Sequence, residues 1–262
     1  MNIVVCIKQV PDTNEVKINP ETNTLIRSGV PSIINPFDEN AIEEGLRLKD
    51  KNGGKVTVVS MGPPQVETAL RDALALGVDD VILVTDRAFA GADTLATSYT
   101  LGRTIEKFVP DYDIIIFGKQ AIDGDTAQVG PGVAEYLGIP EMIYVVNIEK
   151  TENNTISLKR ELEDGFEVAQ SKLPAVITVL KSINTPRYPS LKGKMKAKTA
   201  VIKTVSAKDI EADENRIGLK GSPTWVSRIF TPPPKGNSQI ITDEDGNSAV
   251  FIKNKLKELT II

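Results

Sequence analysis

The stretch DIIIFGKQAIDGDTAQVGPG, residues 113–132, decides the fold that the sequence predicts. It opens with four apolar residues, Ile114 to Phe117, of the β-branched and aromatic types that favour a buried strand. A loop with several glycines follows, and its other residues are mostly small or polar. The segment Thr126–Gly138 then has the apolar spacing of a helix and ends at a glycine. A strand, a glycine-rich turn and a helix in this order predict a unit of a parallel α/β sheet.

Three more apolar runs and three more helical patterns precede this stretch. The apolar runs are continuous rather than alternating, which is typical of parallel strands covered on both faces. They are residues 3–7, 56–60 and 81–85, and the helical patterns are residues 37–54, 64–77 and 92–110. Strands that alternate with helices predict an α/β fold with a doubly wound parallel sheet and right-handed crossovers.

The pattern changes after Pro140. Three short β-like runs separated by turn residues predict antiparallel hairpins over about residues 141–172, a small addition to the sheet. The run 174–180 is one more buried strand, expected to return to the main sheet. Residues 1–198 would then form the α/β domain. Residues 199–262 are expected to form an extended arm that ends in an amphipathic helix and packs on another surface, because the arm has few apolar runs of its own.

Composition narrows the chemistry. The chain has 262 residues, a net charge of −4, one cysteine and no histidine. A serine–histidine nucleophile system and a histidine-ligated metal site are therefore excluded, and one cysteine allows no internal disulfide. The sequence contains no run of 18 apolar residues, so no membrane span is predicted. The N-terminus is interpreted as a first strand and not as a signal peptide. We expect a cytoplasmic protein without a general nucleic-acid surface, whose redox or group-transfer chemistry depends on an organic cofactor or a partner.

The candidate site lies where ligands of doubly wound sheets collect, at the carboxyl ends of the strands. The loop Gly118–Val129 follows the fourth strand, and its glycines allow close backbone approach and positive φ angles. The helix expected from Thr126 offers free N–H groups to an anion. From these residues alone, a loop that wraps a nucleotide phosphate and a plain glycine-rich turn remain equally open. Asp123 and Asp125 would repel a phosphate, so we expect them to cap amides or bind ribose hydroxyls.

Three other features have a simpler interpretation beside the functional one. Asp93 or Thr94 is expected to cap the helix over residues 92–110, and simple capping is favoured over a phosphate contact by Thr97 and Ser98. Asn35 or Asp38 is likewise expected to cap the helix over residues 37–54. Cys6 is most simply a buried residue of a strand.

The segment PRYPSLKGKMKAK, residues 186–198, is rich in lysine and proline. One interpretation is a solvated basic loop. Another is a docking loop, with Tyr188 and Leu191 as apolar anchors and lysines that steer an acidic partner. Nucleic-acid binding is a weaker third interpretation, because the chain is acidic as a whole.

Six segments in order carry a resemblance to a known family: VVCIKQVPD, NPFDENAIEEGLRLK, VSMGPPQVETALRDALALG, GKQAIDGDTAQVGP, LPAVITV and PRYPSLKGKMKAK. Together they resemble the β subunit of electron transfer flavoprotein. The resemblance implies an adenine nucleotide α hydrolase-like fold and an α-subunit partner, whose FAD is clasped partly by the C-terminal arm of the β subunit. It also implies AMP as a structural nucleotide in ordinary members, and a dehydrogenase-docking loop at residues 187–196.

A subset of this family binds FAD instead of AMP in the β subunit, and DGDTAQVGP and ADTLATS are similar to that subset. Such members pass electrons from NADH to ferredoxin or flavodoxin and, through the second FAD in the α subunit, to a partner dehydrogenase. Small Ala127 would leave room for a longer diphosphate and ribityl chain, and the hydroxyls of Thr94, Thr97 and Thr126 would offer it hydrogen bonds. FAD is favoured here and AMP remains the alternative. A nucleotide-hydrolysing or adenylylating enzyme of the same fold is an alternative of another class, and lacks a convincing set of ligands.

The resemblance and the strand-end argument together give two sets of site residues, with no catalytic residue and no metal ligand. The cofactor set is Cys6, Asn35, Pro36, Phe37, Asp38, Met61, Asp93, Thr94, Thr97, Ser98, Gly118, Lys119, Gln120, Ala121, Ile122, Asp123, Gly124, Asp125, Thr126, Ala127, Gln128 and Val129. The docking set is Arg187, Tyr188, Leu191, Lys192, Lys194, Met195 and Lys196.

Overall fold

The computed structural model describes residues 1–12, 31–227, 240, 242–243 and 246–262. The chain divides into two compact units, which we describe separately. The first comprises Met1–Lys17 and Leu25–Ser227, and contains the α/β domain. The second comprises Ile18–Thr24 and Arg228–Ile262, and its described helix is α6, Ser248–Glu258. In the described parts, no helix is both long and apolar enough to cross a membrane.

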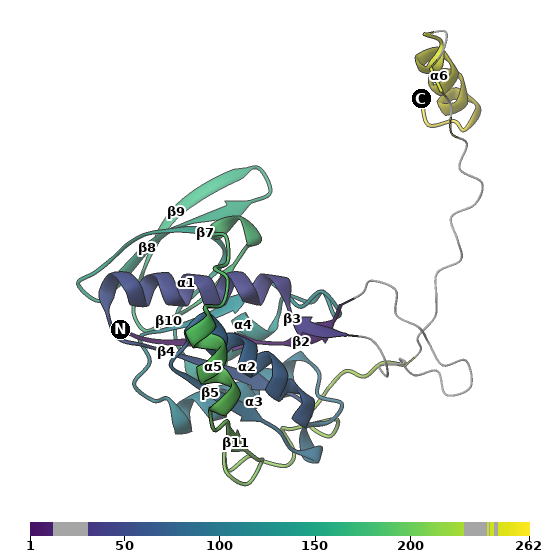
Figure 1. Cartoon of the computed structure of the whole chain (residues 1–262). Helices are drawn as coiled ribbons and strands as arrows, with labels where there is room; N and C mark the ends of the chain where they lie inside the picture. Colours follow the sequence, from purple (N-terminus) through teal and green to yellow (C-terminus); the bar gives the residue numbers. More distant parts are fainter. Residues whose placement is uncertain (13–30, 228–239, 241, 244–245) are drawn as a thin grey trace. The chain divides into compact units, whose positions relative to one another are not determined.

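A nine-stranded sheet forms the centre of the first unit (Figure 1). Its order is β11-β5-β4-β1-β6-β10-β7-β8-β9, and neighbours from β11 to β7 run parallel. The four predicted strands and the returning strand are confirmed: they are β1 (Asn2–Ile7), β4 (Lys55–Met61), β5 (Asp80–Val84), β6 (Ile114–Gly118) and β10 (Ala175–Val179). The doubly wound α/β fold is therefore confirmed.

The antiparallel addition continues the main sheet. Strands β7 (Glu141–Glu152), β8 (Thr155–Leu162) and β9 (Gly165–Lys172) pair antiparallel with one another, and β7 joins the sheet beside β10. Two further short strands, β2 (Gln9–Pro11) and β3 (Ser32–Ile34), form a separate antiparallel pair.

Helices cover both faces of the sheet (Figure 1). Apolar side chains of α1 (Pro36–Asn52), α2 (Glu67–Leu76) and α5 (Leu191–Thr199) belong to the core on one face. Those of α3 (Thr94–Phe108) and α4 (Val129–Leu137) belong to the core on the other face. Short 3-10 turns are η1 (Pro64–Val66), η2 (Arg87–Phe89) and η3 (Lys181–Ile183). The alternating residues of β1 divide between the two cores, with Ile3 and Val5 in one and Val4 and Cys6 in the other.

Three expectations from the sequence need correction. Helix α4 begins at Val129 rather than near Thr126, because Asp125 and Ala127 have positive φ values of 56° and 54° that a right-handed helix cannot contain. Residues 187–196 are not one loop, since α5 begins at Leu191 after Ser190, whose hydroxyl oxygen accepts the N–H of Gly193 at 3.0 Å.

Residues just after position 198 also belong to the first unit instead of a separate arm. The short strand β11 (Lys203–Val205) pairs with β5, and the side chains of Ile210 and Ile217 are buried in the core on the α3 side. The sequence does not predict this packing because its apolar residues are isolated and have no regular period.

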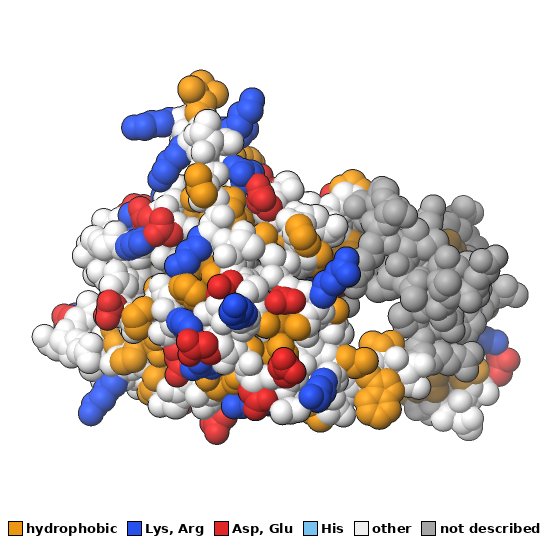
Figure 2. All heavy atoms as spheres, turned by 90° about the horizontal axis from the view of Figure 1, so that it is seen from below, with side chains coloured by type: hydrophobic (Ala, Val, Ile, Leu, Met, Phe, Trp, Pro, Cys, Tyr) orange, Lys and Arg blue, Asp and Glu red, His pale blue; other side chains and the backbone are white. Residues whose placement is uncertain are grey.

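The surface carries charges of both signs, in keeping with the small net charge of −4. On the face shown in Figure 2, lysine and arginine side chains alternate with acidic and hydrophobic ones. Charge-dependent binding of a ligand or partner must therefore depend on local arrangements of residues.

Candidate functional site

The carboxyl ends of β1 and β6 define the point where the sheet reverses its winding. From β1 the sheet grows through β4 and β5 in one direction, and through β6 and β10 in the other. The two strands are neighbours, and Cys6 of β1 lies opposite Phe117 of β6. A crevice at such a point is where open α/β sheets bind ligands. The loop Gly118–Val129 leaves the sheet at this place.

Asp38 joins the two strand ends to the first turn of α1. One carboxylate oxygen accepts the backbone N–H of Lys8 at 2.7 Å, and the other accepts the N–H of Gly118 at 3.2 Å. The side chain is therefore buried while its carboxylate oxygens stay hydrogen-bonded. Asp38 thus fixes the distance between β1, β6 and α1.

Asn35 holds the loop itself. It stands at the N-cap position of α1, but its side chain makes no cap hydrogen bond, so the predicted capping by Asn35 or Asp38 is wrong. Its amide nitrogen donates to the carbonyl of Gln120 at 2.8 Å, and its amide oxygen accepts the N–H of Ile122 at 3.1 Å. The fully buried side chain thus replaces backbone partners that the loop lacks.

The loop glycines have two different functions. A Cβ on Gly118 would lie 2.3 Å from Asp38 Oδ1, and one on Gly130 would lie 2.7 Å from Thr178 Cγ2, so both positions require glycine for close packing. A Cβ on Gly124 would meet nothing within 4 Å. Gly118, Gly124 and Gly130 do not use the positive φ angles that glycine allows, and Asp125 and Ala127 adopt such angles instead. Such angles at non-glycine residues cost about 1–3 kcal/mol each and are concentrated at functional sites.

The two loop aspartates are paired within the chain. Asp123 forms an ion pair with Lys8 at 2.7 Å, and Asp125 accepts a hydrogen bond from the side-chain amide of Gln120. Helix α4 begins without a side-chain cap, so its first N–H groups are available to a ligand. Near the loop, Lys119 lies with its ammonium 5.1 Å from the ring centroid of Tyr144. The free N–H groups at the start of α4 give positive potential there, which suits an anionic group.

The start of α3 is already capped. One oxygen of Asp93 accepts the N–H groups of Leu95 and Ala96 at 3.0 and 3.1 Å, and the other accepts the N–H and hydroxyl of Thr224. Burial raises the pKa of Asp93, but these hydrogen bonds together outweigh it and hold the pKa below its usual range. The capping predicted for Asp93 is confirmed.

Thr94 and Ser98 connect the starts of α3 and α4. The hydroxyl of Thr94 donates to Gln128 Oε1 at 2.9 Å. The buried hydroxyl of Ser98 lies 2.7 Å from the carbonyl of Thr94 and 3.3 Å from that of Val129. A Cβ on Gly132 would lie 2.4 Å from this hydroxyl, so the two helices approach closely here. Thr97 is partly exposed on the same first turns of α3.

Cys6 lies at the base of the site and is buried. Burial, and to a smaller degree the charge of Asp38, raises the pKa of its thiol far above the usual range. A protonated, enclosed thiol is a packing residue, which confirms the simpler interpretation. Met61, the last residue of β4, is only partly buried at the same edge of the sheet.

The titration of Asp38 gives the first prediction. Burial raises its pKa from 3.8 to about 7, although hydrogen bonds and the Lys8 charge oppose the shift. Between these two values the folded state keeps a proton that the unfolded state releases. The carboxyl group therefore lowers the free energy of unfolding as pH rises through this window, by at most about 1.4 kcal/mol per pH unit. Asp38→Asn removes this titration.

Urea unfolding of both proteins at several pH values between 4.5 and 7.5 measures the effect. We expect the difference in the free energy of unfolding, Asp38→Asn minus wild type, to become more positive as pH rises. A constant offset, from the weakened hydrogen bonds to Lys8 and Gly118, is compatible with this result. A difference that stays constant or shrinks with pH would contradict it.

The predicted docking residues lie at the start of α5. Tyr188, Leu191 and Met195 expose 96%, 78% and 66% of their surfaces. Leu191 and Met195 are four residues apart on one side of α5, and Tyr188 lies just before the helix. Lys192, Lys194 and Lys196 lie within the same helix. A hollow of about 570 Å³ between α2 and α5 borders this surface. Exposed apolar side chains ringed by lysines fit an interaction surface.

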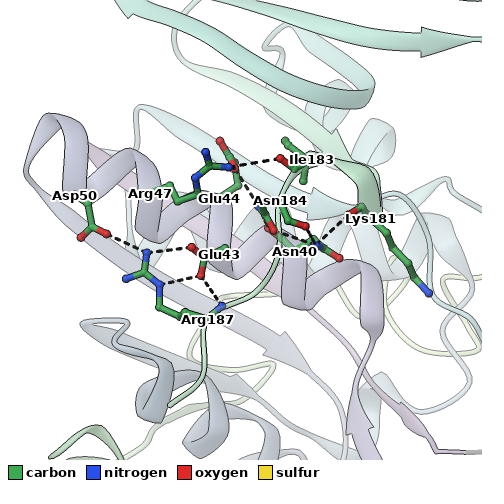
Figure 3. A network of polar contacts seen from close by, with 9 residues as sticks. All are labelled: Asn40, Glu43, Glu44, Arg47, Asp50, Lys181, Ile183, Asn184 and Arg187. Carbon is green, nitrogen blue, oxygen red and sulfur yellow. Dashed lines mark hydrogen bonds and ion pairs between the residues drawn. The ribbon is translucent and has the colours of Figure 1, made fainter. Parts of the chain in front are cut away.

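Arg187, predicted to belong to the docking set, instead holds the preceding segment onto α1 (Figure 3). Its guanidinium donates to both oxygens of Glu43, at 2.8 and 3.1 Å, and to Asp50 at 2.9 Å. Its backbone N–H also donates to Glu43, whose side chain is only 8% exposed. The hydrogen bonds to Glu43 are the main reason that the pKa of Arg187 lies above its usual range.

A second part of this network joins Asn40 and Asn184 (Figure 3). The amide of Asn40 donates to the carbonyl and side chain of Asn184, both at 2.9 Å, and Asn184 donates back to the carbonyl of Asn40 at 3.0 Å. Asn184 also donates to Glu44, which pairs with Arg47. The polar side of α1 thus fixes residues 184–187, which lead into the docking surface.

Sequence reasoning missed three residues at the site. Lys8 neutralises Asp123, Thr178 packs against Gly130, and Tyr144 lies beneath the Lys119 ammonium. The position of Lys8 directly after a strand was a usable signal. Thr178 and Tyr144 belong to strands far along the chain, and only the sheet order brings them to this edge. Among the described residues, no cluster of three or more acidic or cysteine side chains could hold a metal ion.

A family model described as the electron transfer flavoprotein domain matches residues 22–210. The chain is 54% identical to the electron transfer flavoprotein subunit beta of Thermoanaerobacterium thermosaccharolyticum, over 99% of this chain and 98% of that protein. It is 52% identical to the subunit beta of Clostridium acetobutylicum, over 98% of each chain.

A third relative is named as part of a larger assembly. It is the caffeyl-CoA reductase-Etf complex subunit CarD of Acetobacterium woodii, 49% identical over the whole of both chains. The matched domain covers both the loop at the β1–β6 edge and the start of α5. The chain therefore belongs to the electron transfer flavoprotein family, as a β subunit.

Proposed function

We propose that this chain is the β subunit of a cytoplasmic electron transfer flavoprotein heterodimer and binds FAD at the carboxyl ends of β1 and β6. When bound, this flavin supplies the chemistry to accept hydride from NADH and to pass on single electrons. One route leads to ferredoxin or flavodoxin, and the other leads through a second FAD in the α subunit to a flavin-containing dehydrogenase. Together with these partners, the complex would be an NADH-dependent, ferredoxin-reducing oxidoreductase.

The loop Gly118–Val129 fits the phosphate-bearing part of such a cofactor. Its two aspartates are paired within the chain, so the start of α4 and the ammonium of Lys119 set the local potential. The open space at Gly124 leaves the backbone accessible. In the proposal, backbone amides of this loop and the first turn of α4 hold the phosphates. Asn35 and Asp38 keep the loop in place from below and border the adenosine.

The start of α3 fits the rest of a longer cofactor. Thr94, Thr97 and Ser98 lie on its first turns, and Thr94 and Ser98 are in contact with the start of α4. Because Asp93 already caps this helix, we propose hydroxyl contacts to a neutral chain here and not a second anion site. A relative named for a caffeyl-CoA reductase-Etf complex supports a partner that acts on acyl-CoA substrates.

The nucleotides released from the purified heterodimer test this proposal. Acid extraction followed by chromatography should give about two FAD per heterodimer and little AMP. One FAD and one AMP would replace the proposal with a conventional carrier that holds a structural AMP and does not use NADH. If neither nucleotide accompanies this chain in a folded complex, the site assignment itself is wrong.

The surface formed by Tyr188, Leu191 and Met195 is proposed to dock the dehydrogenase. Leu191→Glu should raise the KM for the partner about tenfold or more, because it places a charge in the apolar centre of the contact. The rate at which NADH reduces an artificial dye should not change, since the nucleotide site is separate. Steady-state assays with a purified short-chain acyl-CoA dehydrogenase measure both quantities.

Val168→Glu is the matched control for this substitution. Val168 is also an exposed apolar residue, but lies on β9. An equal rise of KM in both variants would show a general effect of added charge. An unchanged KM in Leu191→Glu would favour the solvated-loop interpretation of this segment.

The second unit fits a role in subunit assembly. Helix α6 has no buried residue, and its Val250 and Ile252 each expose more than half of their surface, as does Leu259 directly after the helix. A helix with so much exposed apolar surface gains stability only against a partner. We propose the α subunit as this partner. Removal of residues 247–262 should weaken the heterodimer, which size-exclusion chromatography across a dilution series would show.

A further inference from the structure

Tyr144 has an unfavourable backbone conformation inside a strand. Its φ is 61°, a region that bulky side chains rarely adopt. The pairing of β7 with β10 shifts register beside it, between Ile177 and Val179. The N–H of Tyr144 donates to the side-chain oxygen of Thr178 at 3.1 Å instead of to a backbone carbonyl of the ladder. Strain of this kind persists when surrounding contacts maintain it, and it is concentrated at functional sites.

The contacts of Tyr144 lead directly to the loop after β6. The ammonium of Lys119 lies 5.1 Å from the centroid of its ring. Lys119 directly follows β6, and its N–H donates to the carbonyl of Val179 at 2.9 Å, which continues the pairing of β6 with β10. A cation over an aromatic ring is attracted by the negative face of that ring. Tyr144 therefore limits where the lysine side chain can reach.

A second set of contacts leads from Tyr144 to α4. Thr178, which accepts the Tyr144 N–H, has its methyl group 2.7 Å from where a Cβ on Gly130 would lie. Gly130 is the second residue of α4. Tyr144 thus contacts Lys119 through its ring and, through its N–H, the side chain of Thr178, which packs against the uncapped start of α4.

The charges around this point are unequal. Asp123 is paired with Lys8, and Asp125 with Gln120. In the parts of the chain that the structure describes, no carboxylate lies within 4.0 Å of the Lys119 ammonium. Lys119 is therefore the cation of this loop that is left for a ligand.

We infer that Tyr144 is a positioning residue that holds Lys119 beside the start of α4 as the counter-charge for a phosphate of the bound nucleotide. The inference rests on the proposed function, because it requires a nucleotide in this loop. It assigns the strained conformation of Tyr144 a purpose: the register shift turns the ring toward the loop and away from a regular strand position.

Titration of the heterodimer with FAD tests the inference. The α-subunit FAD is left in place, the nucleotide of this chain is removed, and the dissociation constant of added FAD is measured by calorimetry. Lys119→Met should raise this constant about tenfold, and Lys119→Arg should largely preserve it. Tyr144→Leu should raise the constant about threefold, whereas Tyr144→Phe, which keeps the ring face, should leave it near the wild-type value.

The double variant separates positioning from simple packing. If Tyr144 acts through Lys119, Tyr144→Leu has no further effect on the dissociation constant once Lys119 is methionine. Phe166→Leu is the matched control, because Phe166 has the Lys159 ammonium 4.2 Å from its ring centroid on the β8–β9 hairpin. It should leave the FAD affinity unchanged.

Two results would overturn the inference while the proposed function stands. One is a wild-type FAD affinity in Lys119→Met, and the other is an equal effect of Tyr144→Leu in both backgrounds. A wild-type complex that binds neither FAD nor AMP on this chain would end the proposed function and the inference together. Thermal unfolding of each variant shows whether a lost affinity comes only from lost stability.

Discussion

Gly118→Ala should lower the free energy of unfolding by about 3 kcal/mol, because a rigid, well-packed site cannot accept the added carbon without displacement. The new Cβ would lie 2.3 Å from Asp38 Oδ1 and 2.6 Å from the backbone carbonyl carbon of Phe37. Neither group can move freely, since Asp38 accepts two backbone N–H groups and Phe37 is in the first turn of α1. Urea unfolding monitored by far-UV circular dichroism measures the change.

Gly124→Val is the informative partner of this variant. A Cβ on Gly124 meets nothing within 4 Å, and its φ is not in the left-handed region, so the free energy of unfolding should change by less than about 0.5 kcal/mol. The nucleotide content of the purified heterodimer should nevertheless fall, because the branched side chain occupies space beside the loop amides. Gly165→Ala, at a turn with equally open space, is the control for both measurements.

Each outcome has a definite meaning. A strong loss of stability in Gly118→Ala together with a normal nucleotide content would show that the packing is important and the ligand is elsewhere. A stable Gly118→Ala would contradict the close packing of Asp38 against β6. Full nucleotide occupancy in Gly124→Val would remove the loop from the binding site.

The strands and the position of the loop could be predicted from the sequence because their signals are local. Continuous apolar runs such as Ile114–Phe117 follow from burial on both faces of a parallel sheet, and the glycines mark the turn. The location of a ligand site at the strand ends is a general property of this sheet topology.

The side-chain partners could not be predicted in this way, because they depend on which strands become neighbours. Asn35 and Asp38 have the residue types of helix caps, yet both bond to segments more than 20 residues distant once β1 and β6 are adjacent. The strained Tyr144 has no signal in the sequence at all. The family resemblance places Arg187 in the docking loop, whereas the partners of its side chain lie on α1, early in the chain.

Arg187→Met is expected to have the second large effect, a loss of about 3 kcal/mol in the free energy of unfolding. Glu43, with its side chain only 8% exposed, would be left as a poorly solvated carboxylate without the two hydrogen bonds from the Arg187 guanidinium. The backbone N–H of residue 187 also donates to Glu43, and this third bond would persist only if the segment stayed in place. Chemical denaturation of the wild type and the variant gives the difference.

Asp50→Asn is the matched control, because Asp50 binds the same guanidinium but its side chain is 61% exposed, and we expect less than about 0.5 kcal/mol there. Glu43→Gln combined with Arg187→Met should be less damaging than the two single losses added together, since no isolated charge remains buried. Simple additivity would show that Arg187 does not act through Glu43.

Because residues 184–187 lead into α5, Arg187→Met should also raise the KM for the dehydrogenase, although Arg187 itself does not contact the dehydrogenase. If Arg187→Met keeps the wild-type free energy of unfolding but loses partner binding, Arg187 is part of the docking contact itself.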